Sequence, residues 1–166
     1  MATARKSTTR ASTRARAPAL PKDAIALLRA DHKRVSALFE QFEKTRSAAR
    51  KQKLVAEICL ELTVHAAIEE EIFYPAVKAA LRDKELVPEA TVEHQSVKDL
   101  IAQVQGIEAD GEMYDARVKV MGEFVKHHVK EEQNEMFPKA AKTRLDMVAL
   151  RDEMLARREA LMAEQA

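Results

Sequence analysis

The sequence contains few of the residues that interrupt helices or that favour β-sheets. Of its 166 residues only three are glycine and five are proline, aromatic residues make up 4%, and tryptophan is absent. Residues that favour helices dominate instead, among them alanine, leucine, glutamate, lysine and arginine. Hydrophobic residues amount to 46%, which is enough for a core. The composition therefore disfavours a β-sandwich or barrel and predicts one all-α domain.

Long apolar runs and cysteine pairs are also missing. No stretch approaches the roughly 18 apolar residues of a membrane span. No apolar segment of about 7–15 residues follows the start, so we expect no secretory signal. Cys59 is the single cysteine, which excludes an internal disulfide, and its apolar neighbours Ile58 and Leu60 predict a buried structural thiol. These features predict a cytoplasmic protein that does not contact a membrane.

Charge is distributed unevenly although the net charge is only +1. Six of the 28 basic residues occur before Asp23, without any acid; the remaining 22 stand against 27 acidic residues. We predict that residues 1–21 form a disordered basic tail, because they have too few large apolar side chains to offset their ordering entropy. A solvated tail is the favoured interpretation. The alternatives are an arm that contacts nucleic acid and, for a eukaryotic source, a transit peptide.

Apolar residues recur at helical spacing in five segments, separated by turn signals such as Asp110-Gly111. The expected helices cover residues 23–46, residues 47 to a break near Pro75, and residues 88–109, 112–142 and 144–163. Pro75 should kink or end the second helix. We expect residues 22–142 to form a four-helix bundle. Residues 143–166 should add a C-terminal helix that covers the bundle.

An internal repeat relates the second and fourth expected helices. Each carries a histidine, a glutamate four residues later and a proline six residues after the glutamate, with an aromatic residue before the proline. The repeat consists of His65, Glu69 and Pro75 and of His128, Glu132 and Pro138. His32 and His94 lie 33 and 34 residues before these motif histidines, in matching segments. The pattern predicts a duplicated helical hairpin and hence an up-down antiparallel four-helix bundle.

The repeated histidines and glutamates predict a metal site. Residues four apart share a helix face, and each histidine falls within an apolar stripe that must face the core. Buried glutamates without cationic partners are costly, and a metal ion would compensate their charge. Imidazole and carboxylate donors suit non-haem iron, and six donors suit two ions. The predicted metal ligands are His32, His65, Glu69, His94, His128 and Glu132.

Other side chains near these motifs receive structural interpretations. Glu70, Glu71 and Glu131 have the phase of a solvated helix face. Tyr74 and Phe137 are expected to be packing residues at the end of the bundle. For any single histidine, a hydrogen-bonded core residue would be the commoner role. Four such histidines, one per helix and two of them followed by glutamate at the same offset, favour the metal site.

Four short motifs together resemble one known family, over residues 23–142. These are Asp31-His32, His65-x-x-x-Glu69 before Phe-Tyr-Pro75, Glu93-His94, and His127-His128-x-x-x-Glu132 before Met-Phe-Pro138. The sequence thus resembles the hemerythrin-like, or HHE cation-binding, family. The resemblance implies a four-helix bundle with a di-iron centre bridged by two carboxylates and an oxygen species. It also implies binding or sensing of dioxygen, nitric oxide or redox state, or a role in iron handling or stress response.

The sequence departs from the oxygen-carrying members, which have a second histidine one turn from the one on the third helix. Ala90 and Lys98 occupy those places here. Water or a carboxylate such as Glu61 could supply the missing donor, and His127 is not assigned. Three functions therefore stay open: a non-catalytic di-iron protein that binds dioxygen, nitric oxide or peroxide, a di-iron oxidase or peroxidase, and a metal-free helical interaction module.

Overall fold

The computed structural model describes residues 18–166, and all regular elements of this part of the chain are helical. Most of the predicted basic tail, residues 1–17, lies outside the described residues. The helices are α1 (Ala24–Lys44), α2 (Ala48–Ile68), α3 (Tyr74–Leu81), α4 (Leu86–Gln105), α5 (Glu112–Glu131), α6 (Phe137–Ala141) and α7 (Met147–Gln165), and two π-helical turns, η1 (Glu69–Phe73) and η2 (Glu132–Met136), join α2 to α3 and α5 to α6.

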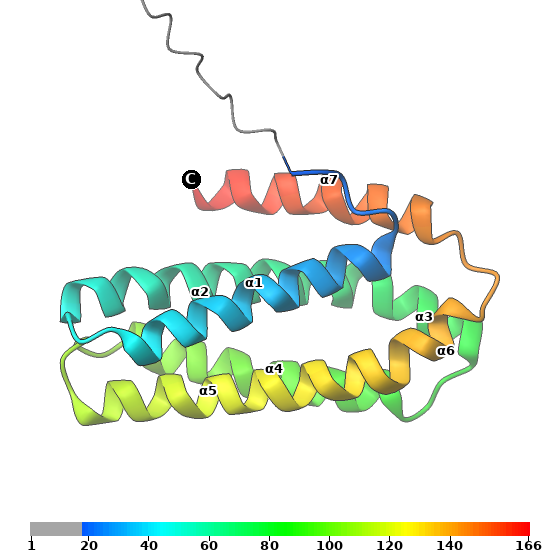
Figure 1. Ribbon diagram of the computed structural model, residues 1–166. Coiled ribbons are helices and arrows are strands. Elements are labelled where there is room, and N and C mark those ends of the chain that lie inside the picture. Colours follow the sequence, from blue (N-terminus) through cyan, green and yellow to red (C-terminus); the bar gives the residue numbers. More distant parts are fainter. Residues whose placement is uncertain (1–17) are drawn as a thin grey trace, which may run out of the picture.

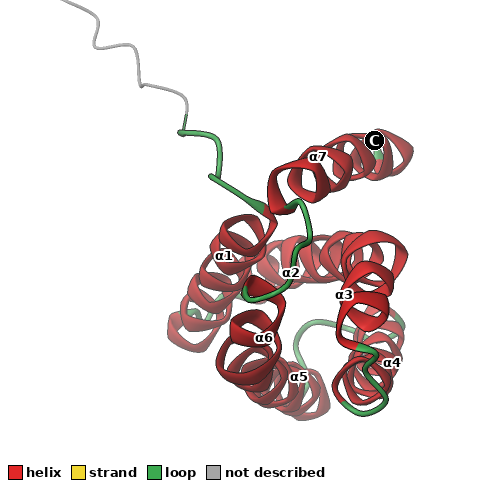
Figure 2. Cartoon of the chain, turned by 90° about the vertical axis from the view of Figure 1, so that its right-hand side faces the viewer, coloured by secondary structure: helices red, strands yellow, loops and turns green. Residues whose placement is uncertain are grey.

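The helices form two antiparallel hairpins that pack on each other. In Figure 1, α1 and α2 form one hairpin, and α4 and α5 form the other. The view along the bundle in Figure 2 places the four long helices around a common axis, with α7 outside them. α7 contacts α1, α2 and η1. The predicted up-down four-helix bundle with an added C-terminal helix is confirmed.

Side-chain caps explain where several helices begin. The Asp23 carboxylate accepts a hydrogen bond from the backbone N–H of Ala26 at 2.8 Å and caps α1. The Ser47 hydroxyl caps α2, as the sequence predicted. The Asp83 carboxylate accepts from the N–H groups of Leu86 and Val87, at 3.1 and 2.8 Å. This cap starts α4 before Pro88, two residues earlier than the sequence predicted.

A π-helical turn precedes each proline of the repeat, so that α2 ends at Ile68 and α5 at Glu131. Tyr74 N–H donates to the Glu69 carbonyl, and Phe137 N–H donates to the Glu132 carbonyl, both across five residues. Five residues of α-helix would rotate the second residue to about 140° from the first. The wider π-turn brings residues five apart onto the same side of the helix. Tyr74 and Phe137 therefore reach the same inner face as the glutamates.

Two apolar clusters fill the interior, one on each side of the predicted metal ligands. The first lies toward the α1–α2 and α4–α5 loops and includes Val35, Ile58, Val97 and Met121. The second lies toward the prolines and includes Leu28, Ile68, Phe73, Phe137 and, from α7, Met154. None of the helices α1–α7 combines the length and hydrophobicity needed to cross a lipid bilayer.

Candidate metal centre

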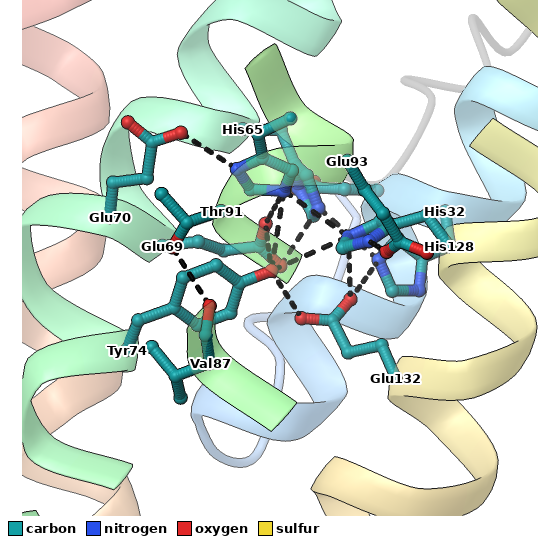
Figure 3. Close-up of polar contacts among 12 residues, drawn as sticks. His32, His65, Glu69, Glu70, Tyr74, Val87, Thr91, Glu93, His128 and Glu132 are labelled. Carbon is teal, nitrogen blue, oxygen red and sulfur yellow. Dashed lines mark hydrogen bonds and ion pairs between the residues drawn. The ribbon is translucent and has the colours of Figure 1, made fainter. Parts of the chain in front are cut away.

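The structure brings all six predicted ligands together in the middle of the bundle. Each is at most 8% exposed, and the two glutamates are 0% and 2% exposed. Figure 3 shows imidazoles from both hairpins around the two carboxylates. The ligand atoms form two groups. The first group consists of His32, His65, Glu69 and Glu132, and the second of Glu69, His94 and His128.

The first group joins the two hairpins. Nε2 of His32 lies 3.2 Å from Nε2 of His65. Oε1 of Glu69 lies 3.0 Å from Nε2 of His65. Oε2 of Glu132 lies 3.1 Å from Nε2 of His32. Two imidazole nitrogens and two carboxylate oxygens therefore surround one point.

The second group uses the other oxygen of Glu69. Oε2 of Glu69 lies 3.1 Å from Nε2 of His94, which lies 3.2 Å from Nε2 of His128. Glu69 thus directs one oxygen to each pair of histidines, as a carboxylate shared by two bound ions would. Glu132 lies between the pairs as well, because its Oε2 is 3.7 Å from Nε2 of His128.

These donor atoms fit metal ions in two respects. Bonds of about 2.1 Å from a transition-metal ion to nitrogen and oxygen place neighbouring donors about 3.0 to 3.4 Å apart. The shortest contacts within the two groups are 3.0–3.2 Å. In addition, Glu69 Oε1 and Glu132 Oε2 are buried and accept no hydrogen bond. Buried carboxylate oxygens without a donor are costly, and bound cations would remove this cost.

A second layer of side chains orients the four imidazoles. Nδ1 of His65, His94 and His128 lies 3.0, 2.8 and 2.6 Å from a carboxylate oxygen, and Nδ1 of His32 lies 2.9 Å from an amide. The partners are, in the same order, Asp31, Glu70, Glu93 and Gln133. The Gln133 amide can present its oxygen after a half-turn. These contacts leave all four Nε2 atoms free to face the centre, as in most metal sites.

Sequence reasoning missed this outer layer, although a signal was present. Each of the four partners directly precedes or follows a predicted ligand in the sequence. Adjacent helical residues point about 100° apart, so a residue beside one ligand can reach the ligand on the neighbouring helix. Glu70, which the sequence assigned to a solvated face, instead accepts a hydrogen bond from His94 and from Lys98, at 2.8 Å each.

Tyr74 also differs from its predicted role. Its ring is buried at the bundle end, as expected, but its hydroxyl points into the centre. Oη lies 3.2 Å from Oε2 of Glu69, 3.0 Å from Oε1 of Glu132, 3.2 Å from Nε2 of His94 and 3.4 Å from Nε2 of His128. Burial and the two carboxylates raise the pKa of this phenol well above its usual value in the metal-free protein. Phe137 packs in the apolar core, as predicted.

Two other residues considered for the site lie outside the two groups. Oε1 of Glu61 is 2.8 Å from Nη2 of Arg34, in a pair on the flank of the bundle. The prediction that Glu61 could replace a missing donor is therefore wrong. The His127 side chain is 63% exposed and lies 3.5 and 3.3 Å from the carboxylates of Glu93 and Glu131.

Protons compensate part of the buried charge in the metal-free protein. Burial opposes a charge on His65, but Glu69 and Asp31 raise the pKa of this imidazole to about 10. The surrounding carboxylates raise the pKa of His128 too, against the effect of burial. Burial and the charge of Glu69 raise the pKa of Glu132. The centre therefore favours positive charge, and bound cations would replace these protons.

Comparisons with known proteins identify the family of the chain. Residues 23–140 match the hemerythrin HHE cation binding domain family. A DNA nickase of Nostoc sp. strain PCC 7120 is 28% identical over 111 residues, which is 67% of this chain but only 31% of the nickase. The chain thus spans about a third of the length of that relative.

A solved structure shares the fold. The crystal structure of a hemerythrin HHE cation binding domain-containing protein from Mycobacterium kansasii superposes with a TM-score of 0.74 and 23% identity. The match covers 86% of this chain and 88% of that one. The family match extends over most of the chain and includes all six converging histidines and glutamates. The chain therefore belongs to the hemerythrin HHE cation-binding domain family.

Proposed function

We propose that this protein binds two iron ions in the buried centre and that the pair binds or senses a small molecule such as dioxygen, nitric oxide or peroxide. The observation that carries the proposal is the position of Glu69. Its two oxygens face separate histidine pairs, and its side chain is fully buried. A single carboxylate shared in this way suits two adjacent cations better than one.

The donor chemistry supports iron as the metal. The ligand atoms are imidazole nitrogens and carboxylate oxygens, and two-histidine-one-carboxylate sets with open positions are typical of non-haem iron. When bound, an iron pair would supply electron exchange and open coordination positions. The protein's own residues hold the donors in place, neutralise charge and exclude bulk water, since every predicted ligand is at most 8% exposed.

A small cavity beside the histidines supports a small ligand. Its volume is about 40 Å³, and its lining combines the four imidazoles with apolar side chains from α1, α2, α4 and α5, including Val35, Leu62, Val97 and Ile101. One water needs about 10–15 Å³ on this measure, so this cavity, whose lining includes the imidazoles that would hold the ions, admits only a molecule of very few heavy atoms. An organic substrate of ordinary size would not fit.

Peroxide turnover is the second candidate. The second group contains only three histidine and glutamate donors, against four in the first. Non-haem iron sites of this donor type keep open positions, and neither group surrounds an ion with more than four protein donors, so an enzyme would have room to bind peroxide. A nucleic-acid strand could not reach donors that are buried to this degree, so this centre does not account for the DNA nicking that the name of the Nostoc relative describes.

The test is anaerobic loading with ferrous iron, followed by removal of loose metal, iron analysis, and Mössbauer spectroscopy after oxidation. We expect about two irons per chain, magnetically coupled to each other. Protein that stays colourless and metal-free after loading would contradict the proposal. The loaded protein is then exposed to nitric oxide and, separately, to peroxide. A stoichiometric spectral change indicates binding, whereas continued loss of peroxide at many equivalents per chain indicates an enzyme.

A further inference from the structure

We propose that the Tyr74 phenolate oxygen is itself a ligand, bound to the metal ion held by Glu69, His94 and His128. This inference rests on the proposed function, since it concerns one of the two ions. It assigns the site a seventh protein ligand, which the histidine and glutamate pattern does not contain.

The spacing of the donor atoms around Tyr74 fits a fourth ligand of the second group. Tyr74 Oη lies 3.2 Å from Glu69 Oε2, 3.2 Å from His94 Nε2 and 3.4 Å from His128 Nε2. These separations match the distance of about 3.0 to 3.4 Å between neighbouring ligands of a transition-metal ion. The phenol oxygen therefore occupies a fourth corner of the second group, at the same spacing as the three donors already there.

Hydrogen-bond donors and acceptors around the Tyr74 hydroxyl do not balance. A phenol has one hydrogen to donate, but four possible acceptors surround Oη. Two are the carboxylate oxygens of Glu69 and Glu132. The other two are the Nε2 atoms of His94 and His128, which present lone pairs in the neutral, metal-binding form of each imidazole, with Nδ1–H donated to its carboxylate partner. A cation among these atoms converts unfavourable contacts between acceptors into bonds.

Phe137, the equivalent residue of the other repeat, has the same ring position without a hydroxyl. The Tyr74 ring stacks on His94 with a centroid distance of 5.3 Å, and the Phe137 ring stacks on His32 at 5.8 Å. Ring packing thus requires no hydroxyl. The hydroxyl occurs only beside the second group, which has three histidine and glutamate donors instead of four. Tyr74 brings both groups to four protein donors.

The binding step releases one proton. The phenol O–H bond breaks as the oxygen–metal bond forms, and the proton passes to solvent. No electron is transferred in this step. The η1 turn makes the contact feasible, because it brings Tyr74 onto the same side of the helix as Glu69.

The experiment uses the full chain loaded with ferric iron, in the wild type, Tyr74→Phe and Tyr114→Phe. The chain contains two tyrosines, so Tyr114→Phe is the matched control; Tyr114 lies in the first apolar cluster, away from the centre. Visible absorption and resonance Raman spectra report a phenolate bound to iron(III) through its charge-transfer band and ring vibrations. We expect these signals in the wild type and in Tyr114→Phe, and their loss in Tyr74→Phe. Competition with a chelator should show at least tenfold weaker binding of one iron in Tyr74→Phe.

Iron content measured on the same samples separates the possible failures. A wild type that holds two irons without a phenolate signal would overturn the Tyr74 ligand and leave the proposed function intact. A signal that survives in Tyr74→Phe would also overturn it. A wild type that binds no iron would overturn both proposals. If circular dichroism shows that Tyr74→Phe does not fold, the spectrum of Tyr114→Phe provides the test. Tyr74 is the only tyrosine left in that variant, so a phenolate signal there must come from Tyr74, and its absence would overturn the Tyr74 ligand.

Discussion

Arg158 of α7 donates a hydrogen bond to the carboxylate oxygen of Asp31 that also lies 3.0 Å from Nδ1 of His65. The sequence predicted α7 only as a cover for the bundle. The structure instead connects α7, through Asp31 on α1, to a predicted metal ligand on α2. The guanidinium holds the carboxylate in the position that orients the imidazole.

We predict that Arg158→Gln weakens iron binding without unfolding the bundle. Loss of an outer partner of a metal-binding histidine typically reduces metal affinity about 10- to 100-fold. The control is Arg157→Gln, which removes the same charge from an exposed pair with Glu71. Iron retention against a chelator should fall about tenfold in the first variant and stay unchanged in the second. Equal retention in both would show that α7 is only a cover.

The second prediction concerns Cys59, which is 1% exposed, as the sequence predicted. Burial raises the pKa of its thiol from 9.0 to about 11. The native protein should therefore not react with a thiol reagent at pH 8, whereas denatured protein should react fully. Rapid reaction of the native protein would contradict this.

The same pKa shift predicts how stability depends on pH. The folded state holds the thiol proton more tightly than the unfolded state, so the contribution of Cys59 is fully present below about pH 9. It should be lost progressively as the pH rises toward 11. Chemical denaturation of the wild type and Cys59→Ala across this range measures the contribution, because the variant should lack this component of the pH dependence.

The six ligands could be predicted from the sequence because they follow a short residue pattern within single helices, and this pattern occurs twice. The interval of four residues places His65 and Glu69 on one face in any α-helix. The match with His128 and Glu132 then implies that the two faces meet. The convergence of these side chains therefore required no knowledge of interhelical distances.

The parts that the sequence did not reveal depend on departures from α-helical geometry or on contacts between helices. With 3.6 residues per turn, Tyr74 points away from Glu69; only the π-turn reverses this. Glu61 has the phase of a ligand, one turn before His65, yet it pairs with Arg34 on α1. The angle and position at which two helices cross decide which acid on one helix reaches the other. The spacing of residues within a single helix contains no information about this crossing.

The third prediction concerns the N-terminal tail, of which residues 1–17 lie outside the described residues. The residues of the centre and its outer partners fall between Asp31 and Arg158, and the core begins at Ala24. Deletion of residues 1–17 should therefore leave iron content and melting temperature unchanged. A large loss of either would show that the tail packs on the bundle. Salt-sensitive nucleic-acid binding that disappears with the deletion would support the alternative of a binding arm.

The fourth prediction follows from the shared position of Glu69. Because its oxygens face both histidine pairs, Glu69→Gln should reduce binding of both irons, although it preserves the shape of the side chain. Glutamine removes a negative charge that offsets the two cations and replaces one oxygen donor by an amide nitrogen. His94→Ala should mainly affect one iron, and Glu61→Gln, at the Arg34 pair, should retain two. Iron content and apo and holo melting curves provide the measurement. If Glu69→Gln keeps two irons, Glu69 does not bridge them, and its burial must serve the fold instead.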